Sequence, residues 1–342
     1  MKNNILKEKS NVSSKAPPVW MMRQAGRYHK HYQQLRAKHS FMDLCKIPEL
    51  AAEVAFGPVQ DFDFDVSILF SDLLFPLEAV GMGLEYTDHG PRLGFQLNEE
   101  SISRLKTWQD ALPELQFQKE AMILTRQRIP ANKSVIGFVG GLWTLFVYAV
   151  EGSHAGSLTV SKKSSELYQN FCKLMLPLIR ENIRLQFEGG ADVVMIFDTA
   201  AGELSPAMYQ RWVAPTLAEL ATAYPNRLGY YSKGTQASFF DKSFLALPWA
   251  GMGFDHRWDL PSILNGKTLS APGFVQGNFD QSLLFLSATD FEKEFRNYLK
   301  SYQELSPEQR SSWICGLGHG VLPKTPEENV RRFVQIVREV FA

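Results

Sequence analysis

The chain alternates between short apolar runs and longer segments in which apolar residues recur at helical spacing. Eight apolar runs are continuous enough to predict strands buried on both faces, as in a parallel sheet. The repetition of strand and helix without a break in composition predicts an α/β fold, a single (β/α)8 TIM barrel over residues 17–342. The predicted strands are Val19–Met22, Val66–Phe70, Val135–Val139, Val193–Phe197, Leu228–Tyr231, Gly251–Phe254, Gly273–Val275 and Trp313–Cys315.

The last segment shows the helical pattern most clearly. Valine and phenylalanine recur on one face of residues 330–341, which predicts an amphipathic helix. Thr325 stands three residues before Glu328 and predicts a capping box at the start of this helix, with Pro326 at its first position.

Two segments depart from the barrel pattern. Residues 81–115 are too long for a plain connection, and Gly81–Phe95 predicts a β-hairpin inserted after the second strand, with residues 88–91 at its tip. Residues 1–16 are polar and lack the apolar core of a secretory signal, so we expect a flexible N-terminal arm.

Composition and charge exclude several classes of partner. The chain of 342 residues has 36 basic and 36 acidic side chains, and this balance argues against a broad nucleic-acid interface. No apolar run reaches the ~18 residues that a membrane helix requires. The three cysteines lie far apart, which indicates a reducing compartment. We therefore expect a cytoplasmic protein that binds neither membrane nor nucleic acid.

Polar residues and glycines follow every predicted strand. In a parallel barrel the loops after the strands build the active site, so these positions are the candidates for chemistry. They include Arg23, Arg27, Ser71-Asp72, Gly140-Gly141, Asp198-Thr199, Ser232-Lys233, Asp255-His256, Gln276–Asn278 and Gly316–Gly320.

The first of these loops carries the clearest anion-binding pattern. Arg23 and Arg27 flank Gln24, Ala25 and Gly26, and the small residues leave backbone N–H groups open to an approaching anion. Arginine presents a fork of donors that suits carboxylate or phosphate. A solvated basic turn is the plain alternative.

Three further side chains have both a structural and a functional interpretation. Asp72 follows an apolar strand, where it serves either as a helix cap or ion-pair partner or as a site carboxylate. His319 lies in a glycine-rich loop that indicates close approach of the backbone to a ligand. Tyr148 interrupts an apolar run and is a core residue or a site phenol. No cysteine pair has zinc-ligand spacing, so we predict no metal site and no cofactor.

Taken together, these motifs resemble the uroporphyrinogen decarboxylase family from about Pro18 to the C-terminal helix. The resemblance rests on the segments Pro18–Tyr28, Phe70–Asp72, Gly137–Leu145, Tyr148–Gly152, Gln276–Asn278 and Leu317–Gly320. It implies a cofactor-free, homodimeric TIM-barrel enzyme. Such an enzyme removes carbon dioxide from the four acetate side chains of uroporphyrinogen III and gives coproporphyrinogen III for heme biosynthesis.

The resemblance also implies roles for individual residues. Arg23 and Arg27 would bind substrate carboxylates, and the backbone of Gln24, Ala25 and Gly26 would add donors. Asp72 would be the central carboxylate, with Tyr148 and His319 lining the cleft. Thr199 aligns with the usual serine of the family. The catalytic set would be Asp72, Arg23, Arg27 and Tyr148.

Two other functions remain compatible with the sequence. A zinc-dependent corrinoid or thiol methyltransferase shares this barrel, but its chemistry needs clustered histidine and cysteine ligands. A tetrapyrrole-binding protein without activity would keep the arginines and could lose Asp72 and Tyr148. Both of these residues are present, so the decarboxylase is the favoured interpretation.

Overall fold

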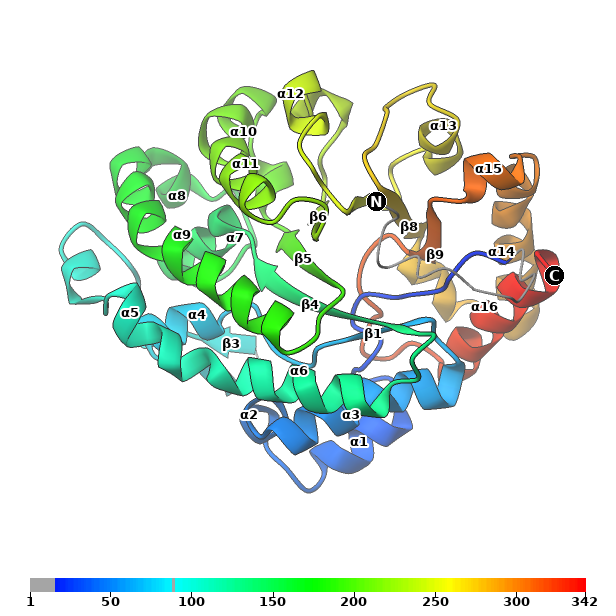
Figure 1. Ribbon diagram of the computed structural model, residues 1–342, viewed down its shortest axis with the longest axis horizontal. Coiled ribbons are helices and arrows are strands. Elements are labelled where there is room, and N and C mark those ends of the chain that lie inside the picture. The colour runs from blue at the N-terminus through cyan, green and yellow to red at the C-terminus, as the bar shows by residue number, and fades with distance from the viewer. Residues whose placement is uncertain (1–15, 88–89) are drawn as a thin grey trace.

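The computed structural model describes residues 16–87 and 90–342. Within them, parallel strands form one curled sheet in the order β1-β4-β5-β6-β7-β8-β9, and helices surround it (Figure 1). This is an α/β barrel architecture, as the apolar runs predict. The strands of this sheet are β1 (Val66–Ile68), β4 (Ser134–Gly140), β5 (Val193–Asp198), β6 (Leu228–Ser232), β7 (Gly251–Gly253), β8 (Phe274–Phe279) and β9 (Trp313–Leu317).

Helices connect successive strands and pack against the outside of the sheet. The longer ones are α3 (Pro48–Phe62), α6 (Gln116–Arg128), α7 (Leu142–Glu151), α9 (Ser165–Glu188), α11 (Ala214–Ala223), α14 (Ala288–Gln303) and α16 (Glu327–Val340). The shorter α-helices are α1 (Lys30–Arg36), α2 (Phe41–Lys46), α4 (Phe75–Leu77), α5 (Trp108–Ala111), α8 (Thr159–Lys163), α10 (Pro206–Trp212), α12 (Lys242–Leu245), α13 (Leu260–Leu264) and α15 (Pro307–Arg310). A π-helical turn spans Glu78–Met82, and 3-10 turns span Ser101–Arg104, Leu112–Leu115, Ala201–Glu203, Ala237–Phe239 and Gln281–Phe285.

The barrel sheet has seven strands within the described residues, rather than the eight that the apolar runs predict. The first run forms only an isolated parallel bridge, between Val19 and Cys315. The Val19 N–H donates to the Asp65 carboxylate at 2.7 Å, and Pro18 has no N–H to donate. Hydrogen bonds still reach both neighbours, from Trp20 N to Cys315 O at 3.1 Å and from Asp65 N to Val19 O at 3.1 Å. The segment therefore lies between β9 and β1 without continuing a ladder.

Side chains on the two faces of the sheet belong to two separate apolar clusters. Alternate strand residues share a face of the sheet. One set of side chains therefore points into the barrel, between the strands, and the other set packs against the surrounding helices. The cluster on the helix side is the larger of the two. The cluster among the strands consists of Trp20, Met22, Val66, Ile68, Ile136, Val193, Met195, Phe197, Tyr231, Ala250, Phe274 and Ile314.

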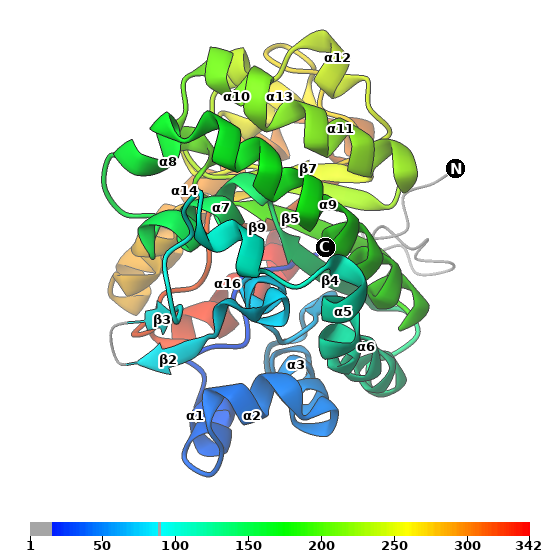
Figure 2. The ribbon, with the colours of Figure 1, turned by 90° about the vertical axis from the view of Figure 1, so that its left-hand side faces the viewer.

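An antiparallel pair of strands lies where the sequence predicts the hairpin. β2 (Glu85–Thr87) and β3 (Gly90–Arg92) form a separate two-stranded sheet (Figure 2). Residues 88–89 of the predicted tip lie outside the described residues, as do residues 1–15 of the predicted N-terminal arm. Ala16, at the end of that arm, is buried.

The predicted C-terminal helix is confirmed, but its predicted capping box is wrong. α16 buries Val330, Phe333 and Val337 in the larger apolar cluster. Pro326 occupies the N-cap in an extended conformation, so the helix begins one residue later than the box requires. The Thr325 hydroxyl is buried and has no hydrogen-bond partner among the residues that the structure describes. Of the helices described, none has the length and apolar character to cross a membrane.

Candidate active site

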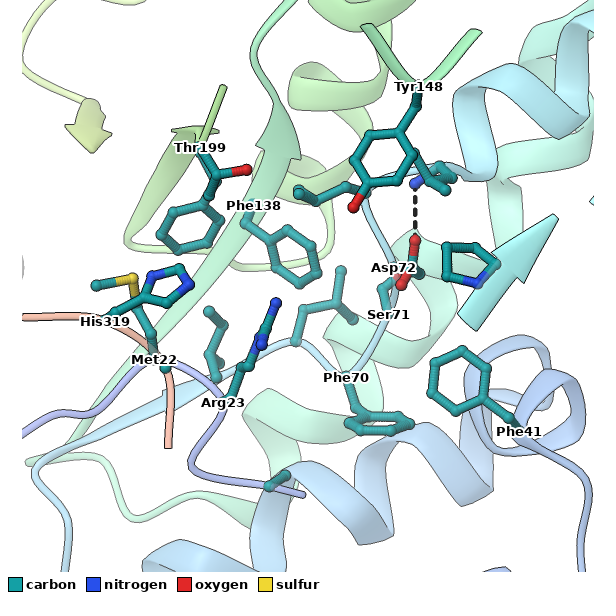
Figure 3. A pocket seen from close by; sticks show the side chains of 18 residues that line it. Met22, Arg23, Phe41, Phe70, Ser71, Asp72, Phe138, Tyr148, Thr199 and His319 are labelled. Atoms are coloured by element: carbon teal, nitrogen blue, oxygen red, sulfur yellow. Dashed lines mark hydrogen bonds between the residues drawn. The ribbon is translucent and has the colours of Figure 1, made fainter. Parts of the chain in front are cut away.

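A cavity of about 320 Å³ opens at the carboxyl ends of the barrel strands (Figure 3). Its wall is largely apolar, with Phe138 and Phe197 among its aromatic side chains. An apolar pocket with a few convergent polar groups is the usual form of a small-molecule site. The polar and charged lining residues are Arg23, Ser71, Asp72, Tyr148, Thr199 and His319.

Asp72 follows β1 and lines this cavity. One carboxylate oxygen accepts the N–H of Leu74 at 2.9 Å, which fixes the side chain. Burial raises the pKa of Asp72, while the Leu74 N–H, the Tyr86 hydroxyl and the Arg23 charge act in the opposite direction. Asp72 forms no ion pair within 4.0 Å in the described part of the chain. The carboxylate is thus held in place and still able to receive donors from a ligand.

Arg23 occupies a backbone conformation that favours glycine, with φ at 58°. Such strained residues are often found at ligand-binding sites, and of the four non-glycine residues with positive φ in the described chain only Arg23 lines the cavity. Gly320 makes room for the arginine, because a Cβ there would lie 2.5 Å from the Arg23 Cδ. The side chain reaches into the cavity toward Asp72 and Phe138 (Figure 3). Within residues 16–87 and 90–342 it has no hydrogen-bond or ion-pair partner, so its donors remain open.

In the rest of this loop, one side chain supports the backbone and three backbone N–H groups are left open. Gln24 is buried and its amide donates to Val66 O at 2.9 Å, so its side chain supports the loop. The N–H groups of Ala25, Gly26 and Arg27 have no acceptor among the described residues. Ala25 lines the cavity, whereas Arg27 is exposed and does not. The structure brings together Arg23 and Ala25 but leaves Arg27 outside the wall.

Tyr148 and Thr199 approach from the opposite wall (Figure 3). Tyr148 lies in the last turn of α7, and burial, followed by the nearby Asp72 charge, raises its pKa to about 12. The phenol therefore keeps its proton at neutral pH. Thr199 is the first residue after β5 and lines the cavity from the end of that strand.

His319 lines the cavity as a neutral imidazole. Burial and then the charges of Arg23 and Lys233 lower its pKa to about 3. The Tyr231 hydroxyl donates to Gly318 O at 2.8 Å and lies 3.1 Å from His319 Nδ1. Since the hydroxyl has one proton, Nδ1 is the donor to it and Nε2 keeps a lone pair. His319 therefore offers an acceptor to a ligand.

Over residues 16–87 and 90–342, no three histidine, cysteine, aspartate or glutamate side chains form a group that could hold a metal ion. The cavity instead combines one arginine, one carboxylate and neutral hydroxyl and imidazole groups. This donor set suits an organic molecule that carries both carboxylates and N–H groups.

Comparison with known proteins decides the family. The profile of the family described as uroporphyrinogen decarboxylase (URO-D) matches residues 2–340. A protein named uroporphyrinogen decarboxylase from Synechococcus sp. (strain JA-2-3B'a(2-13)) is 35% identical, over 94% of this chain and 93% of its own. One of the same name from Myxococcus xanthus (strain DK1622) is 34% identical, over 98% and 96%. This chain belongs to the uroporphyrinogen decarboxylase family.

Solved structures extend the comparison to the fold of this decarboxylase family. A methyltransferase from Methanosarcina mazei superposes with a TM-score of 0.72 at 18% identity, over 96% of this chain and 95% of its own. A putative vitamin-B12 independent methionine synthase from Listeria monocytogenes has a TM-score of 0.54 at 10% identity, over 96% of each chain. At such identities the likeness concerns the fold alone.

Two residues near this site in the decarboxylase fold, Tyr86 and His154, were not singled out from the sequence, whereas Asp198 is a strand-end candidate to which the sequence assigns no role. Asp198 ends β5 and accepts both the N–H and the hydroxyl of Thr144, at 3.0 and 2.5 Å, which ties α7 to the strand. Tyr86 on β2 has a buried hydroxyl that makes no well-formed hydrogen bond within the described part of the chain but lies close enough to Asp72 to affect its pKa. His154 bonds to Tyr148. Only Tyr86 had a signal, since Leu84 and Tyr86 alternate with the polar Glu85 and Thr87.

Proposed function

We propose that this protein is a carboxy-lyase that acts on uroporphyrinogen. It removes carbon dioxide from the four acetate side chains of uroporphyrinogen III and yields coproporphyrinogen III for heme biosynthesis. The observation that carries this proposal is the Asp72 carboxylate, which lines an apolar cavity and is held by the Leu74 N–H. Family membership indicates the substrate class, and the Asp72 carboxylate provides a group that can stabilise a cationic intermediate.

The reaction needs an electron sink. Loss of carbon dioxide leaves an electron pair on a methylene carbon, which is unfavourable without an acceptor. Protonation of the ring carbon beside the one that bears the acetate creates a conjugated iminium cation, and the electron pair moves into it. A proton then adds to the methylene, and the ring carbon loses its proton. Each acetate therefore takes up one proton and releases one carbon dioxide.

Asp72 serves this chemistry in two ways. It accepts hydrogen bonds from the pyrrole N–H groups, and its charge stabilises the cation as the cation forms. A preorganised charge in a cavity with little water contributes several kcal/mol to such a step. The saturated bridges of the reduced macrocycle allow it to dome until all four nitrogens face one carboxylate, whereas a flat oxidised porphyrin cannot do so.

The other residues hold the substrate around this centre. Arg23 and Arg27 bind substrate carboxylates, assisted by the open N–H groups of Ala25 and Gly26 next to Gln24. Tyr148, Thr199 and His319 contact the ring or its acidic side chains. Arg23, Arg27 and Tyr148 join Asp72 as catalytic residues. Two observations support this assignment: Arg23 lines the cavity with no ion-pair partner among the described residues, and His319 presents an acceptor there.

The same proposal covers assembly and location. The Pro18–Trp20 segment fills the eighth position of the barrel, supported by its hydrogen bonds toward β9 and β1, and residues 81–115 are an insertion that carries β2 and β3. The protein forms a homodimer, as its family resemblance implies. It works in the cytoplasm without membrane or nucleic-acid partners, consistent with the free thiols of Cys45, Cys172 and Cys315.

An anaerobic assay with uroporphyrinogen III tests the function. Purified protein is stripped of metal with a chelator, and the products are separated by their number of carboxylates. We expect coproporphyrinogen at the same rate before and after chelation. Absence of coproporphyrinogen would contradict the proposal. Zinc-dependent methyl transfer would favour the methyltransferase, and tight binding without turnover would favour a carrier.

A further inference from the structure

Tyr148 is hydrogen-bonded to a histidine from the loop that follows its own helix. The Tyr148 Oη lies 2.6 Å from His154 Nδ1, and the two ring centroids are 5.3 Å apart. Gly152 ends α7 with φ at 79°, and its N–H bonds to Tyr148 O at 2.9 Å. This reversal, which favours glycine, brings His154 back over the last turn of the helix.

The charges around His154 favour its neutral form. Burial lowers the pKa of His154, and the charges of Lys233 and Arg23 lower it further, while Glu203 acts in the opposite direction. His319 is the other titratable group that interacts with it. A neutral imidazole has two tautomers: with its proton on Nε2 it accepts the hydroxyl proton of Tyr148 at Nδ1, and with its proton on Nδ1 it donates to the phenol oxygen.

This pairing determines what Tyr148 offers to the cavity. In the Nε2–H tautomer the phenol proton is directed at His154, and the phenol oxygen keeps its lone pairs for the cavity into which it points (Figure 3). We propose that His154 is a positioning residue that holds Tyr148 as a hydrogen-bond acceptor toward the pyrrole N–H groups. This inference rests on the proposed function. A second acceptor beside Asp72 favours the ring as positive charge develops on it.

Protonation of His154 would reverse the arrangement. Nδ1–H would then donate to the Tyr148 oxygen, and the hydroxyl proton would turn toward the cavity. The Tyr148 hydroxyl would then point its proton at the pyrrole N–H groups, which are also donors. Protonated His154 would add a positive charge near the cationic ring. We therefore expect part of the acid-side loss of kcat to follow the titration of His154.

Two substitutions separate positioning from packing. His154→Ala removes the acceptor, and we expect kcat to fall about tenfold with KM changed less than about twofold. His154→Asn places an amide oxygen where Nδ1 lies but cannot titrate there. We expect it to keep kcat within about threefold and to lose the His154 component of the acid limb. Ser157→Ala, at an exposed position of the same loop, is the control and should change neither constant.

A double-mutant cycle and a spectroscopic measurement complete the test. In a Tyr148→Phe background, His154→Ala should have no further effect on kcat. In substrate-free protein, the ¹⁵N resonance of His154 Nδ1 should report an accepted hydrogen bond and should shift in Tyr148→Phe. Equal losses in both backgrounds, or no shift of that resonance, would overturn the inference. If the wild-type protein lacks decarboxylase activity, the proposed function fails, and the resonance still decides whether the pair exists.

Discussion

Two aspartates follow apolar strands at the same end of the barrel, and their surroundings give them different roles. Asp72 comes after β1 and lines the cavity, whereas Asp198 ends β5 and is fully buried. Burial raises the pKa of both side chains, to about 6 for Asp198. Asp198 accepts two hydrogen bonds from Thr144, while Asp72 accepts one from the backbone at Leu74.

The difference lies in what fills the space in front of each carboxylate. A Cβ at Gly141 would lie 2.5 Å from the Asp198 Cγ, so the start of α7 closes over that side chain. In front of Asp72 there is a cavity, and the Arg23 side chain reaches into it (Figure 3). Asp72 is therefore accessible to a ligand, whereas the start of α7 covers Asp198.

Removing the charge of Asp72 should have the largest effect on catalysis. We expect Asp72→Asn to lower kcat at least about 100-fold, because a neutral amide cannot offset a cationic intermediate. Asp198→Asn should lower kcat less than about tenfold, since that side chain does not face the ligand. Anaerobic turnover of both variants checks the comparison. Similar losses in the two would show that both carboxylates act in the same way.

The two arginines of the first loop should differ because only one lines the cavity. We expect Arg23→Ala to lower kcat/KM by about 100-fold, since its guanidinium lies nearest to the centre. For Arg27→Ala we expect KM to rise about tenfold, at least as much as kcat falls. Steady-state kinetics measures both. An unchanged KM in Arg27→Ala would place that residue outside the substrate cleft.

The buried aspartate should influence stability more than catalysis. Because the folded state raises the pKa of Asp198 to about 6 from an ordinary 3.8, the native protein holds more protons between these values. The free energy of unfolding should therefore fall as the pH rises from about 4 to about 6, and this component should level off above that range. Asp198→Asn should lose the slope. Denaturant unfolding at several pH values checks this, and a retained slope would assign it to other groups.

Tyr86 should have the smallest effect, on the pH profile of Asp72. The phenol lowers the pKa of the carboxylate and competes with the effect of burial. In Tyr86→Phe we expect the acid limb of kcat/KM to move to higher pH, with less than about threefold loss at neutral pH. The phenylalanine keeps the ring contact with Phe41, whose centroid lies 4.4 Å away. An acid limb that stays in place would show that Tyr86 does not interact with Asp72.

Much of the fold followed from the pattern of apolar runs. Seven of the eight predicted strands appear because buried parallel strands are continuously apolar, and the amphipathic C-terminal helix appears for its periodicity. The strand predicted at Val19 is only an isolated bridge. An apolar run does not reveal that the Val19 N–H donates to the Asp65 carboxylate instead of to a neighbouring strand. The capping box at Thr325 failed because the following proline holds an extended conformation.

Several residues that the sequence indicates as candidates lie around one cavity, and most of them are in loops that follow strands. Arg23, Ala25, Asp72, Tyr148, Thr199 and His319 converge on one cavity. The roles of these residues stay predictions, as does that of Arg27. Partners such as Tyr86 and His154 depend on how loops fold back, and no short-range pattern encodes that. Asp198 follows a predicted strand just as Asp72 does, so the sequence marked both positions but could not show which of the two carboxylates lines the cavity.

A crystal structure with coproporphyrinogen bound under anaerobic conditions tests the central claim most directly. The product keeps the reduced macrocycle and its four pyrrole N–H groups. We predict a domed ring with its nitrogens within about 3.2 Å of the Asp72 carboxylate, a normal N–H···O hydrogen-bond distance. A ring whose nitrogens point away from Asp72, or an Asp72 that contacts only the peripheral side chains, would contradict the account.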